Sequence, residues 1–460
     1  MSQLPVDCLI EIFQYLEEDK FTMYSCLLVN RIWCQASVRI FWKKIRNYDT
    51  IIGCLPLELK EKNGLSTKYP TFNYVSFCKM ISIYEINYNI RLLLRKKIST
   101  QKIYKVLQEI YKLLMSQISS LKELKLSVDS FNQNVNFISY PRAKNCLKDL
   151  SELYYDSDVN PNLIYQLSRI CHNILSIKII IQRKNMTNEL DELANLIAVQ
   201  KNLNCLQIYL WHCNIEDNND KLSFIPNNFD QLIIHGSIYF IPLAFIGNLR
   251  NLKEMILSFR NSDSFDDFYI FRSVNFPFLR SLKFTYKCPR NEFLIKFLEN
   301  NGQNLIEFYV HEGNNLLNLA IVKFCPNLIR LSTGFKNNEL ETLKIIFIHL
   351  HNLETIRVWC CEEYPKEVDI FKIVVNYSNE HFHELKLTYS YYVRTPSTLL
   401  PEEVENFFIE WSNRTPRKAL SLMVYENDGY DLTQNDRIRD IIEKYIKLGV
   451  VEKFKIIGHY

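Results

Sequence analysis

From residue 121 onward, apolar side chains recur in one pattern: an apolar residue, two others, an apolar residue, one other, and a third apolar residue. The first positions of the predicted units are Leu121, Leu147 (a weaker copy), Ile174, Leu203, Phe229, Leu252, Leu279, Leu305, Leu328, Leu353 and Phe382. Successive first positions lie 23 to 29 residues apart. Because alternating apolar positions predict a half-buried strand, each unit is expected to contain one short strand.

The residues upstream of each strand predict a helix and a turn. Stretches such as 193–199 and 319–325 read as helical. The residue directly before the first position is Asn in six units: Asn173, Asn202, Asn251, Asn304, Asn327 and Asn352. Asn tolerates the left-handed conformation that ends many helices. Since neither helix nor strand buries its apolar side alone, the units are expected to stack into an α/β solenoid with a curved parallel sheet on its concave side.

The first 45 residues predict three short helices instead. Leu9, Ile12, Phe13 and Leu16 form one apolar stripe at helical spacing, behind Pro5 at a favoured first-turn position. Two further stripes of helical spacing follow before residue 46. A unit of this size is too small to bury so much apolar surface. It is therefore either a cap packed on the next domain or a docking surface for another protein.

The same residues resemble the F-box motif, in which a Leu-Pro pair, I-F-x-Y-L, L-x-x-V-x-R-x-W and a final Trp follow in order. Leu4-Pro5, residues 12–16, residues 26–33 and Trp42 match these anchors. The resemblance implies binding to a Skp-type adaptor and, through it, to the cullin and RING subunits of a ubiquitin ligase. The adaptor-binding residues that it implies are Leu4, Pro5, Leu9, Ile12, Leu16, Val29 and Trp33.

The repeat array resembles leucine-rich repeats of the cysteine-containing type that follow F-boxes, because its interval falls within the range of about 20–29 residues for that class. The Asn or Cys that usually follows the last strand leucine is mostly absent, and only Cys361 fills the position cleanly. Later strands are expected around Leu422 and Phe454, with a helix capped by Thr433 between them and Gly449 past its end. Residues 400–460 are interpreted as degenerate repeats with a terminal cap.

Residues 46–120 are predicted as a helical transition segment between the F-box at 1–45 and the solenoid at 121–460. Ser99 or Thr100 is a candidate cap for a helix whose apolar stripe runs through residues 103–114. Basic residues without an acid occupy the window 91–105. Such a run is a nucleic-acid patch or nuclear signal in some proteins. More often it is the solvated side of a helix, which is the interpretation favoured here.

Composition narrows the function classes. In 460 residues, 55 Lys and Arg stand against 51 Asp and Glu, and 47% of the residues are hydrophobic. This balance indicates a folded chain and does not favour a general polyanion binder. The 13 cysteines form no C-x-x-C pair, which favours reduced thiols in the cytosol or nucleus. No signal peptide and no apolar run of membrane-spanning length are recognised, so no membrane association is expected.

Motifs for catalysis or cofactor binding are not recognised. No phosphate-binding glycine loop and no G-x-S-x-G motif occur. His349-x-His351 and His381-x-His383 are candidate metal ligands, but no Cys or carboxylate completes a zinc-like spacing, so turn residues are favoured. The sequence therefore predicts a non-catalytic protein without a metal or cofactor.

Side chains at the fifth and seventh positions of each unit are expected to project from the concave strand face, where solenoids usually bind their partners. Aromatic residues and Arg are enriched at binding hot spots. The candidate target-binding residues are Tyr209, His235, Lys283, Tyr309, Arg357, Trp359 and Lys386. Tyr309, Arg357 and Trp359 are expected to be exposed on one surface, where substitution would leave the stability unchanged.

These observations lead to one principal hypothesis. The chain is predicted to be the substrate-recognition subunit of an SCF-type (Skp–cullin–F-box) ubiquitin ligase, in which the F-box docks on the adaptor and the solenoid holds a target protein. An alternative is a non-catalytic scaffold or inhibitor that acts outside a ligase. A third class, a nucleic-acid binder that uses the window 91–105, has less support.

Overall fold

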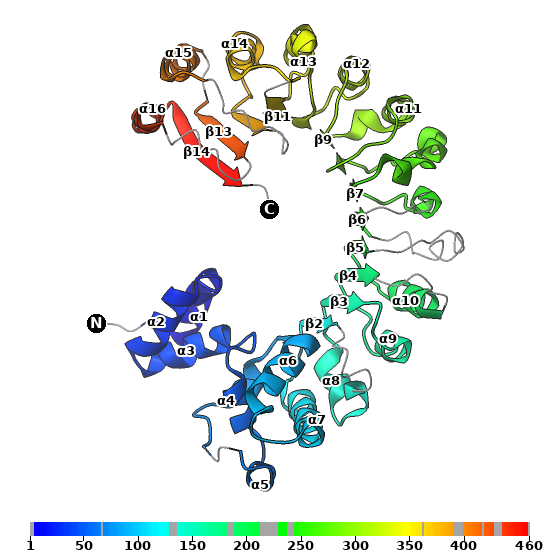
Figure 1. Ribbon diagram of the computed structural model, residues 1–460, viewed down its shortest axis with the longest axis vertical. Helices are drawn as coiled ribbons and strands as arrows, with labels where there is room; N and C mark the ends of the chain where they lie inside the picture. The colour runs from blue at the N-terminus through cyan, green and yellow to red at the C-terminus, as the bar shows by residue number, and fades with distance from the viewer. Residues whose placement is uncertain are drawn as a thin grey trace. The chain divides into compact units, whose positions relative to one another are not determined.

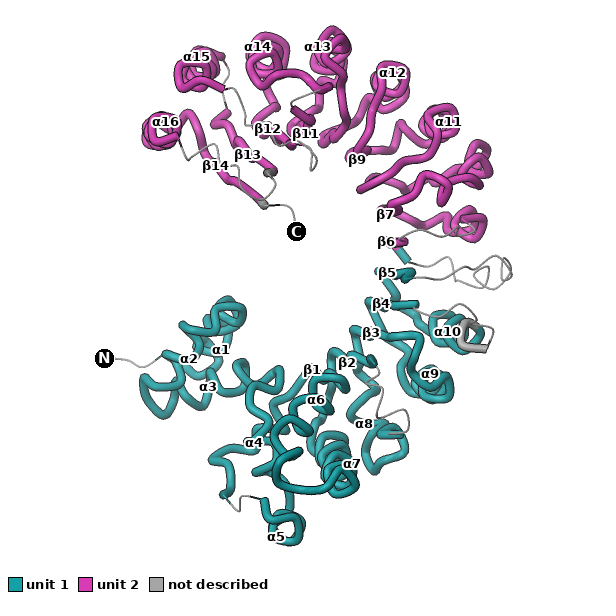
Figure 2. The backbone as a smooth tube through the Cα atoms, in the orientation of Figure 1, with its two compact units in different colours: residues 1–213, 218–229 teal, residues 214–217, 230–460 magenta. Residues whose placement is uncertain are grey.

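A computed structural model describes residues 4–65, 68–127, 136–181, 188–211, 229–236, 243–360, 363–389, 399–415, 418–426 and 435–458. The chain divides into two compact units (Figure 2). Unit 1 contains residues 1–213 and 218–229, and unit 2 contains residues 214–217 and 230–460.

Unit 1 begins with three short helices and continues into alternating strands and helices (Figure 1). Its helices are α1 (Val6–Tyr15), α2 (Lys20–Val29), α3 (Arg31–Phe41), α4 (Tyr48–Gly53), α5 (Leu57–Lys62), α6 (Ile83–Leu94), α7 (Thr100–Gln117), α8 (Ala143–Leu147), α9 (Pro161–Ser168) and α10 (Asn188–Ala198). Its strands are β1 (Met80–Ser82), β2 (Glu123–Leu126), β3 (Glu152–Asp156), β4 (Ser176–Ile181) and β5 (Cys205–Leu210).

Unit 2 repeats strand and helix throughout. Its strands are β6 (Gln231–Gly236), β7 (Glu254–Phe259), β8 (Ser281–Phe284), β9 (Glu307–Val310), β10 (Arg330–Ser332), β11 (Thr355–Cys360), β12 (Glu384–Tyr389), β13 (Leu420–Glu426) and β14 (Val451–Gly458). Its α-helices are α11 (Asn291–Asn301), α12 (Asn315–Phe324), α13 (Leu340–His349), α14 (Glu367–Tyr377), α15 (Pro401–Ser412) and α16 (Asp436–Lys447). Short 3-10 helices, including Ala244–Asn248 and Phe268–Ser273, stand in place of longer helices near β7 and β8.

Within each unit the strands pair in parallel and follow one another in chain order. In unit 1, Leu124 of β2 pairs with Leu153 of β3. In unit 2, Leu282 of β8 pairs with Phe308 of β9. Since neighbouring parallel strands need a crossover connection, the helices that join them lie along one face of each sheet, as Figure 1 shows. This is the predicted α/β architecture of stacked helix–strand units.

Alternation along the strands separates a core face from an open face. In β4, Ile177, Ile179 and Ile181 are buried, whereas the residues between them are half-exposed. The predicted fourth and sixth positions, such as Leu206 and Ile208, lie in the core. We call the opposite side, formed by the third, fifth and seventh positions, the strand face. The predicted core positions of the strands are therefore confirmed.

The predicted helix after Ser99 is also confirmed. It forms α7, and the apolar stripe from Ile103 to Leu114 is buried. Basic residues of the window 91–105, such as Arg95, Lys96 and Lys102, are exposed around the turn between α6 and α7.

Two features of unit 1 differ from the predicted repeat. The first strand, β1, lies inside the segment predicted as a helical transition and pairs with β2, so the sheet begins earlier than residue 121. The weak copy assigned to Leu147 is misplaced, because Leu147 ends helix α8 and the strand pattern runs through Leu150, Leu153 and Tyr155. Leu147 and Leu150 are three residues apart, the same interval as the first two apolar positions of a unit, and this coincidence produced the shift of three residues.

Buried amide side chains close the turns between helices and strands. Gln200 donates to the carbonyl oxygens of Cys171 and Leu196 at 2.8 Å and accepts from the Ile174 amide at 2.9 Å. Asn301 accepts from the Phe276 amide at 2.7 Å. A buried backbone group without a partner is costly, so these contacts stabilise the turns.

Asn379 makes the same kind of contact in unit 2, donating to Leu350 and Leu353. The six asparagines that the sequence placed directly before the first positions are exposed. Among the described residues other than glycine, only Arg142 has a positive φ. The expectation of left-handed asparagines was therefore wrong: the amides that matter lie three or four residues before the first position.

The C-terminal part of unit 2 continues the array, as predicted. Strands β13 and β14 contain Leu422 and Phe454, and α16 lies between them. Its cap is Asn435, whose side chain accepts from the Arg437 amide at 3.1 Å. Gly449 follows the helix with a φ of 66°, a conformation that suits glycine. Thr433 and Cys361, which the sequence singled out, lie outside the described residues.

Candidate functional site: two interaction surfaces

Helices α1, α2 and α3 form a small core of their own. Leu9, Phe13, Met23, Cys26, Ala36 and Ile40 make up this buried cluster. Asp19 caps α2 by accepting from the amides of Phe21 and Thr22, both at 3.1 Å. Asn30 caps α3 by accepting from the Trp33 amide at 2.9 Å. These caps satisfy amides that would otherwise be unpaired at the helix starts and fix where each helix begins.

The same helices expose an unusual amount of apolar side chain. We call these residues the exposed apolar set: Leu4, Val6, Ile12, Tyr15, Phe21, Tyr24, Leu28 and Val29. Tyr15 is 90% exposed, Phe21 is 89% exposed and Leu28 is 72% exposed. Phe21, Tyr24 and Leu28 lie on one side of α2, opposite the buried Met23 and Cys26. Concentrated apolar exposure of this kind marks protein interaction sites.

Four of the seven residues implied for adaptor binding are accessible. Leu4, Pro5, Ile12 and Val29 are all exposed. Leu4 and Pro5 precede α1, and Pro5 occupies its N-cap position. The sequence did not single out Tyr15, Phe21 and Leu28 as binding residues, although α1 and α2 carry apolar residues on more than one helical face, which was the available signal.

The other three implied residues lie wholly or partly inside the helical core. Leu9 is buried in the cluster, and Leu16 packs against it half-buried. Trp33 is also half-buried, and its ring meets Phe13 edge to face with 5.1 Å between centroids. Leu9 therefore supports the surface from below and does not form part of it.

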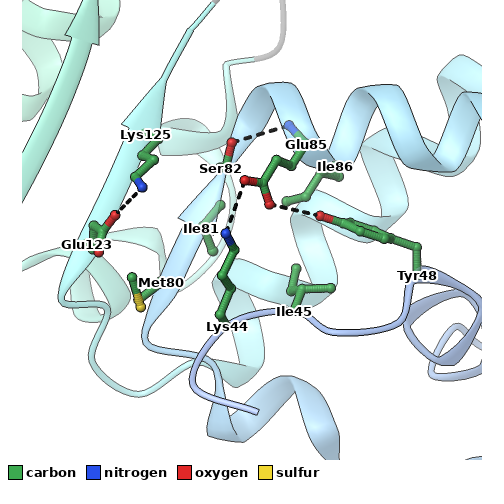
Figure 3. Close-up of a pocket in the computed structure, with 10 residues that line it drawn as sticks. All are labelled: Lys44, Ile45, Tyr48, Met80, Ile81, Ser82, Glu85, Ile86, Glu123 and Lys125. Atoms are coloured by element: carbon green, nitrogen blue, oxygen red, sulfur yellow. Dashed lines mark hydrogen bonds and ion pairs between the residues drawn. The ribbon is translucent and has the colours of Figure 1, made fainter. Parts of the chain in front are cut away.

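A polar junction joins the end of the helical unit to the first strand (Figure 3). Lys44 pairs with the Glu85 carboxylate at 3.2 Å, and the Tyr48 hydroxyl lies 3.4 Å from the same carboxylate. Burial, together with the negative charge of Glu85, raises the pKa of Tyr48. The Met80 amide donates to the Lys43 carbonyl at 3.0 Å, so the backbone is joined as well. These contacts join the segment that follows α3 to β1 and α6.

The strand face carries acids and bases in adjacent rows. Third positions include Glu254, Glu307 and Glu384, and fifth positions include Lys283 and Lys386. Lys283 lies 3.1 Å from both Glu254 and Glu307, and Lys386 lies 2.9 Å from Glu384.

Lys283 also changes the titration of its partner Glu307. Burial alone would raise the pKa of the Glu307 carboxyl, but the hydrogen bonds from Lys283 and Ser281, together with the charges of Lys283 and Arg330, outweigh burial and lower that pKa. Lys283 and Lys386, both predicted to bind a target, are therefore already paired with carboxylates of their own sheet.

Three other predicted residues come together on the strand face of unit 2. Arg357 and Trp359 of β11 and Tyr309 of β9 are joined by Tyr425 of β13, which the sequence did not identify. The Arg357 guanidinium carbon lies 5.5 Å from the Tyr309 ring centroid, 5.7 Å from that of Trp359 and 4.0 Å from that of Tyr425. Arg357 Nε donates to Thr388 Oγ1 at 2.7 Å. We call these five residues the arginine cluster.

Trp359 departs from its predicted exposure. It projects from the strand face in register with Thr388, yet it is only 1% exposed. Its ring contacts Tyr309 at a centroid distance of 6.1 Å and His311 at 5.1 Å. The expectation that Trp359 is exposed is therefore wrong, and because its ring is buried we now expect its substitution to lower the stability.

The remaining two candidates belong to strands β5 and β6. Tyr209 belongs to β5 of unit 1, where the Lys178 ammonium lies 4.3 Å from its ring centroid. His235 belongs to β6 at the start of unit 2 and is half-buried. The structure thus brings together Tyr309, Arg357 and Trp359, with Lys283 and Lys386 in the same row on neighbouring strands.

The described residues include no arrangement that stands out as a catalytic or metal-binding group. The described residues contain no group of three or more His, Cys, Asp or Glu side chains placed to hold a metal ion. Burial raises the pKa of Cys146 and Cys171 to about 12, which leaves little thiolate. His349 ends α13, and His381 and His383 lie in the turn before β12. No helix in the described part of the chain has the length and apolar character needed to cross a membrane.

Comparison with known proteins bears on the helical unit most directly. Residues 1–48 match the F-box-like family. A search of curated protein sequences finds no match. Among solved structures, the chain resembles one described as the Rad7 and Elc1 complex in yeast, with 12% identity, a TM-score of 0.41 and coverage of 97% of this chain and 91% of that one.

A second solved structure is the leucine-rich-repeat-containing protein LegL7 from Legionella pneumophila. It shares 14% identity with a TM-score of 0.39, covering 70% of this chain and 96% of that one. The family match, the three-helix core and the strand–helix units described above agree with one another. The chain carries an F-box-like domain at its N-terminus, followed by a leucine-rich-repeat-like region of parallel strands and helices.

Proposed function

We propose that this protein is the substrate-recognition subunit of an SCF-type ubiquitin ligase. An F-box-like domain followed by leucine-rich-repeat-like units is the architecture of such adaptors, which are typically non-catalytic. In this proposal the exposed apolar set docks on a Skp-type adaptor, which connects the chain to cullin and RING subunits. The strand face of unit 2 binds the target protein, and other subunits transfer ubiquitin.

The observation that carries the proposal is the exposed apolar set within the region that matches the F-box-like family. Phe13 and Met23 already give the three helices a core, so fully exposed side chains such as Tyr15 and Phe21 add nothing to it. Burying them on a partner would gain about 25 cal/mol for each Å² of apolar area removed from water. The contacts of Lys43 and Lys44 with Met80 and Glu85 would then fix the orientation of the docked helices relative to β1.

The proposal is tested by co-purification of the full chain with a Skp-type adaptor. Replacing Leu4, Pro5 and Ile12 together by Ala should weaken adaptor binding at least tenfold, while the thermal unfolding of the chain stays the same. Leu316→Ala is the matched control, because Leu316 is an equally exposed apolar residue on α12 of unit 2. Unchanged adaptor binding by the triple variant would overturn the ligase proposal.

A further inference from the structure

We propose that the arginine cluster is a receptor for the carboxylate side chain of an extended, acidic segment of a target protein. The inference deepens the target-binding part of the proposed function by naming the chemistry of the target. It does not depend on adaptor binding, because all the residues involved belong to the strand face of unit 2.

Charge pairing distinguishes Arg357 from the cations around it. Lys283 has two carboxylate partners, Lys386 has Glu384, and Arg330 lies 3.6 Å from Glu307. Arg357 forms no ion pair with any carboxylate in the described part of the chain; its contacts are the Thr388 hydroxyl and the aromatic rings. A guanidinium stays charged at every physiological pH, so this part of the strand face presents an uncompensated positive charge.

The surroundings of Arg357 hold its guanidinium in one orientation. Thr388 occupies the Nε–H group, and the three rings limit the plane in which the guanidinium can lie. The terminal N–H groups form the end of the fork that binds a carboxylate through two parallel hydrogen bonds. Because the side chain is ordered before a ligand arrives, binding costs little rotamer entropy.

The packing of the aromatic rings in the arginine cluster depends on one small residue of β10, Ser332. Ser332 lies between Tyr309 and Arg357 in the register of the three strands. Since its side chain is small, the rings of Tyr309 and Trp359 can approach each other over β10 with 6.1 Å between centroids. Ser332 is buried, and its hydroxyl has no hydrogen-bond partner among the described residues. A buried polar group without a partner calls for an explanation, and a bound ligand group at this place would supply one.

The charge of the site favours a carboxylate over a phosphate. Arg357 supplies a single positive charge and one two-pronged fork, which match one carboxylate. A phosphate group carries about −1.5 to −2 charges and is usually met by a cluster of cations. The neighbouring Lys386 and Lys283 are neutralised by glutamates of the sheet, so they do not supply that cluster.

The position of Arg357 favours a side chain within an extended segment. Strands β9 and β10 precede β11 in the sheet, and β12, β13 and β14 follow it. Fifth-position residues flank Arg357 on both sides, Ser332 on β10 and Lys386 on β12. A bound segment can therefore continue across the strand face in both directions from its acidic residue.

The test uses the full chain and a phage-displayed library of random dodecapeptides, whose fused C-termini present only side-chain carboxylates. Peptides enriched on the wild-type chain should carry Asp or Glu at one shared position. One enriched peptide is then synthesised with Glu, Gln or phosphoserine at that position, and its affinity is measured by fluorescence anisotropy. The wild-type chain should bind the Glu form at least tenfold more tightly than the Gln form.

Substitutions assign that preference to one residue. Arg357→Gln should remove the tenfold preference for the Glu form, and Arg357→Lys, which keeps the charge without the fork, should recover only part of it. Lys386→Gln is the matched control, since it lies in the same row one strand away, and it should change affinity less than threefold. Thermal unfolding of each variant is measured in parallel, and Arg357→Lys serves as the folded comparison if Arg357→Gln is unstable.

Several outcomes would overturn the inference. The first is that the enriched peptides share no acidic position. The second is that no enriched peptide depends on Arg357 for binding. The third is that the phosphoserine peptide binds more than tenfold more tightly than the Glu peptide. Adaptor binding is recorded for the same proteins. An Arg357-dependent preference in a chain that fails to bind the adaptor supports this inference and rejects the ligase proposal, whereas adaptor binding without the preference does the reverse.

Discussion

The exposed apolar set of the N-terminal helices and the strand face of unit 2 differ in how many of their side chains are already packed or paired within the chain. Tyr15 and Phe21 stand almost wholly in water, although three helices around them already share a core. On the strand face, large aromatic residues are packed and charged residues are paired. Trp359 lies under neighbouring rings, and Lys283 sits between two glutamates.

The difference separates two ways of binding a partner. The helical surface offers apolar area, which is non-directional and gains free energy in proportion to the area covered. The strand face offers little free apolar area, so its selectivity must come from the few groups that its own contacts leave unsatisfied. Arg357 is the clearest of these groups, which is why the two surfaces call for different mutations.

The largest expected effect concerns the core beneath the strand face. Leu282→Asp places a carboxylate at a fully buried position between neighbouring strands. An unpaired buried charge costs several kcal/mol, on the order of 4 or more. Circular-dichroism melting should show loss of cooperative unfolding in unit 2. Arg280→Asp, at an exposed position beside it, should change the unfolding free energy by less than about 0.5 kcal/mol.

A second substitution compares packed and unpacked apolar side chains directly. Trp359→Ala removes a buried ring and should lower the free energy of unfolding by about 3 kcal/mol or more. Ile12→Ala truncates an exposed side chain and should change it by no more than about 0.5 kcal/mol. Urea titrations of the two variants measure both values. Equal effects would contradict the distinction between the surfaces.

A third prediction concerns the buried amides. Asn301→Ala leaves the Phe276 amide and the Val274 carbonyl without their partner and should cost about 2 kcal/mol. Its control is Asn304→Ala, which alters an exposed asparagine of the same turn and should cost less than about 0.5 kcal/mol. Chemical denaturation is the measurement. If Asn304→Ala lowered the free energy of unfolding more than Asn301→Ala, the asparagine directly before the first position would be the one that stabilises the turn.

The smallest expected effect is a pH dependence of the strand face. The pKa of Glu307 is lowered in the folded chain, because Lys283, with smaller contributions from Ser281 and Arg330, outweighs the effect of burial. The stability from this pair is therefore fully present above the ordinary glutamate pKa of about 4.3 and is lost as the pH falls below it. The contribution should be under about 1 kcal/mol, since both side chains are partly exposed. In Lys283→Gln, unfolding free energies measured from pH 6 to pH 3 should fall less steeply than in the wild type.

Much of the fold follows from the sequence because stacked units repeat the same short-range pattern. The core positions of β4 to β12, such as Ile177 and Leu385, are set by alternation along one strand and recur at similar intervals. The strand β1 was not predicted, because its three residues are too few to show alternation before α6 begins. The prediction of a first position at Leu147 is wrong because Leu147 ends a helix three residues before Leu150, which matches the interval between the first two apolar positions of a unit.

The sites were less predictable than the fold, for a physical reason. The motif pointed to the helical surface but included Leu9, since a motif records core and surface residues alike. Arg357 and Tyr309 could be placed on one face from their positions in the repeat. Their partner Tyr425 could not be identified, because that contact joins β11 to β13 and depends on side-chain reach across an intervening strand.

The buried amides also have a consequence for the order in which the protein folds. Gln200 completes a turn that begins at Cys171, 29 residues earlier, and Asn301 reaches back 25 residues to Phe276. During synthesis the earlier turn emerges first and keeps its backbone groups in water until the later amide arrives. These two turns are therefore completed only by the following unit, so folding of the array at these places should lag the ribosome by about one repeat.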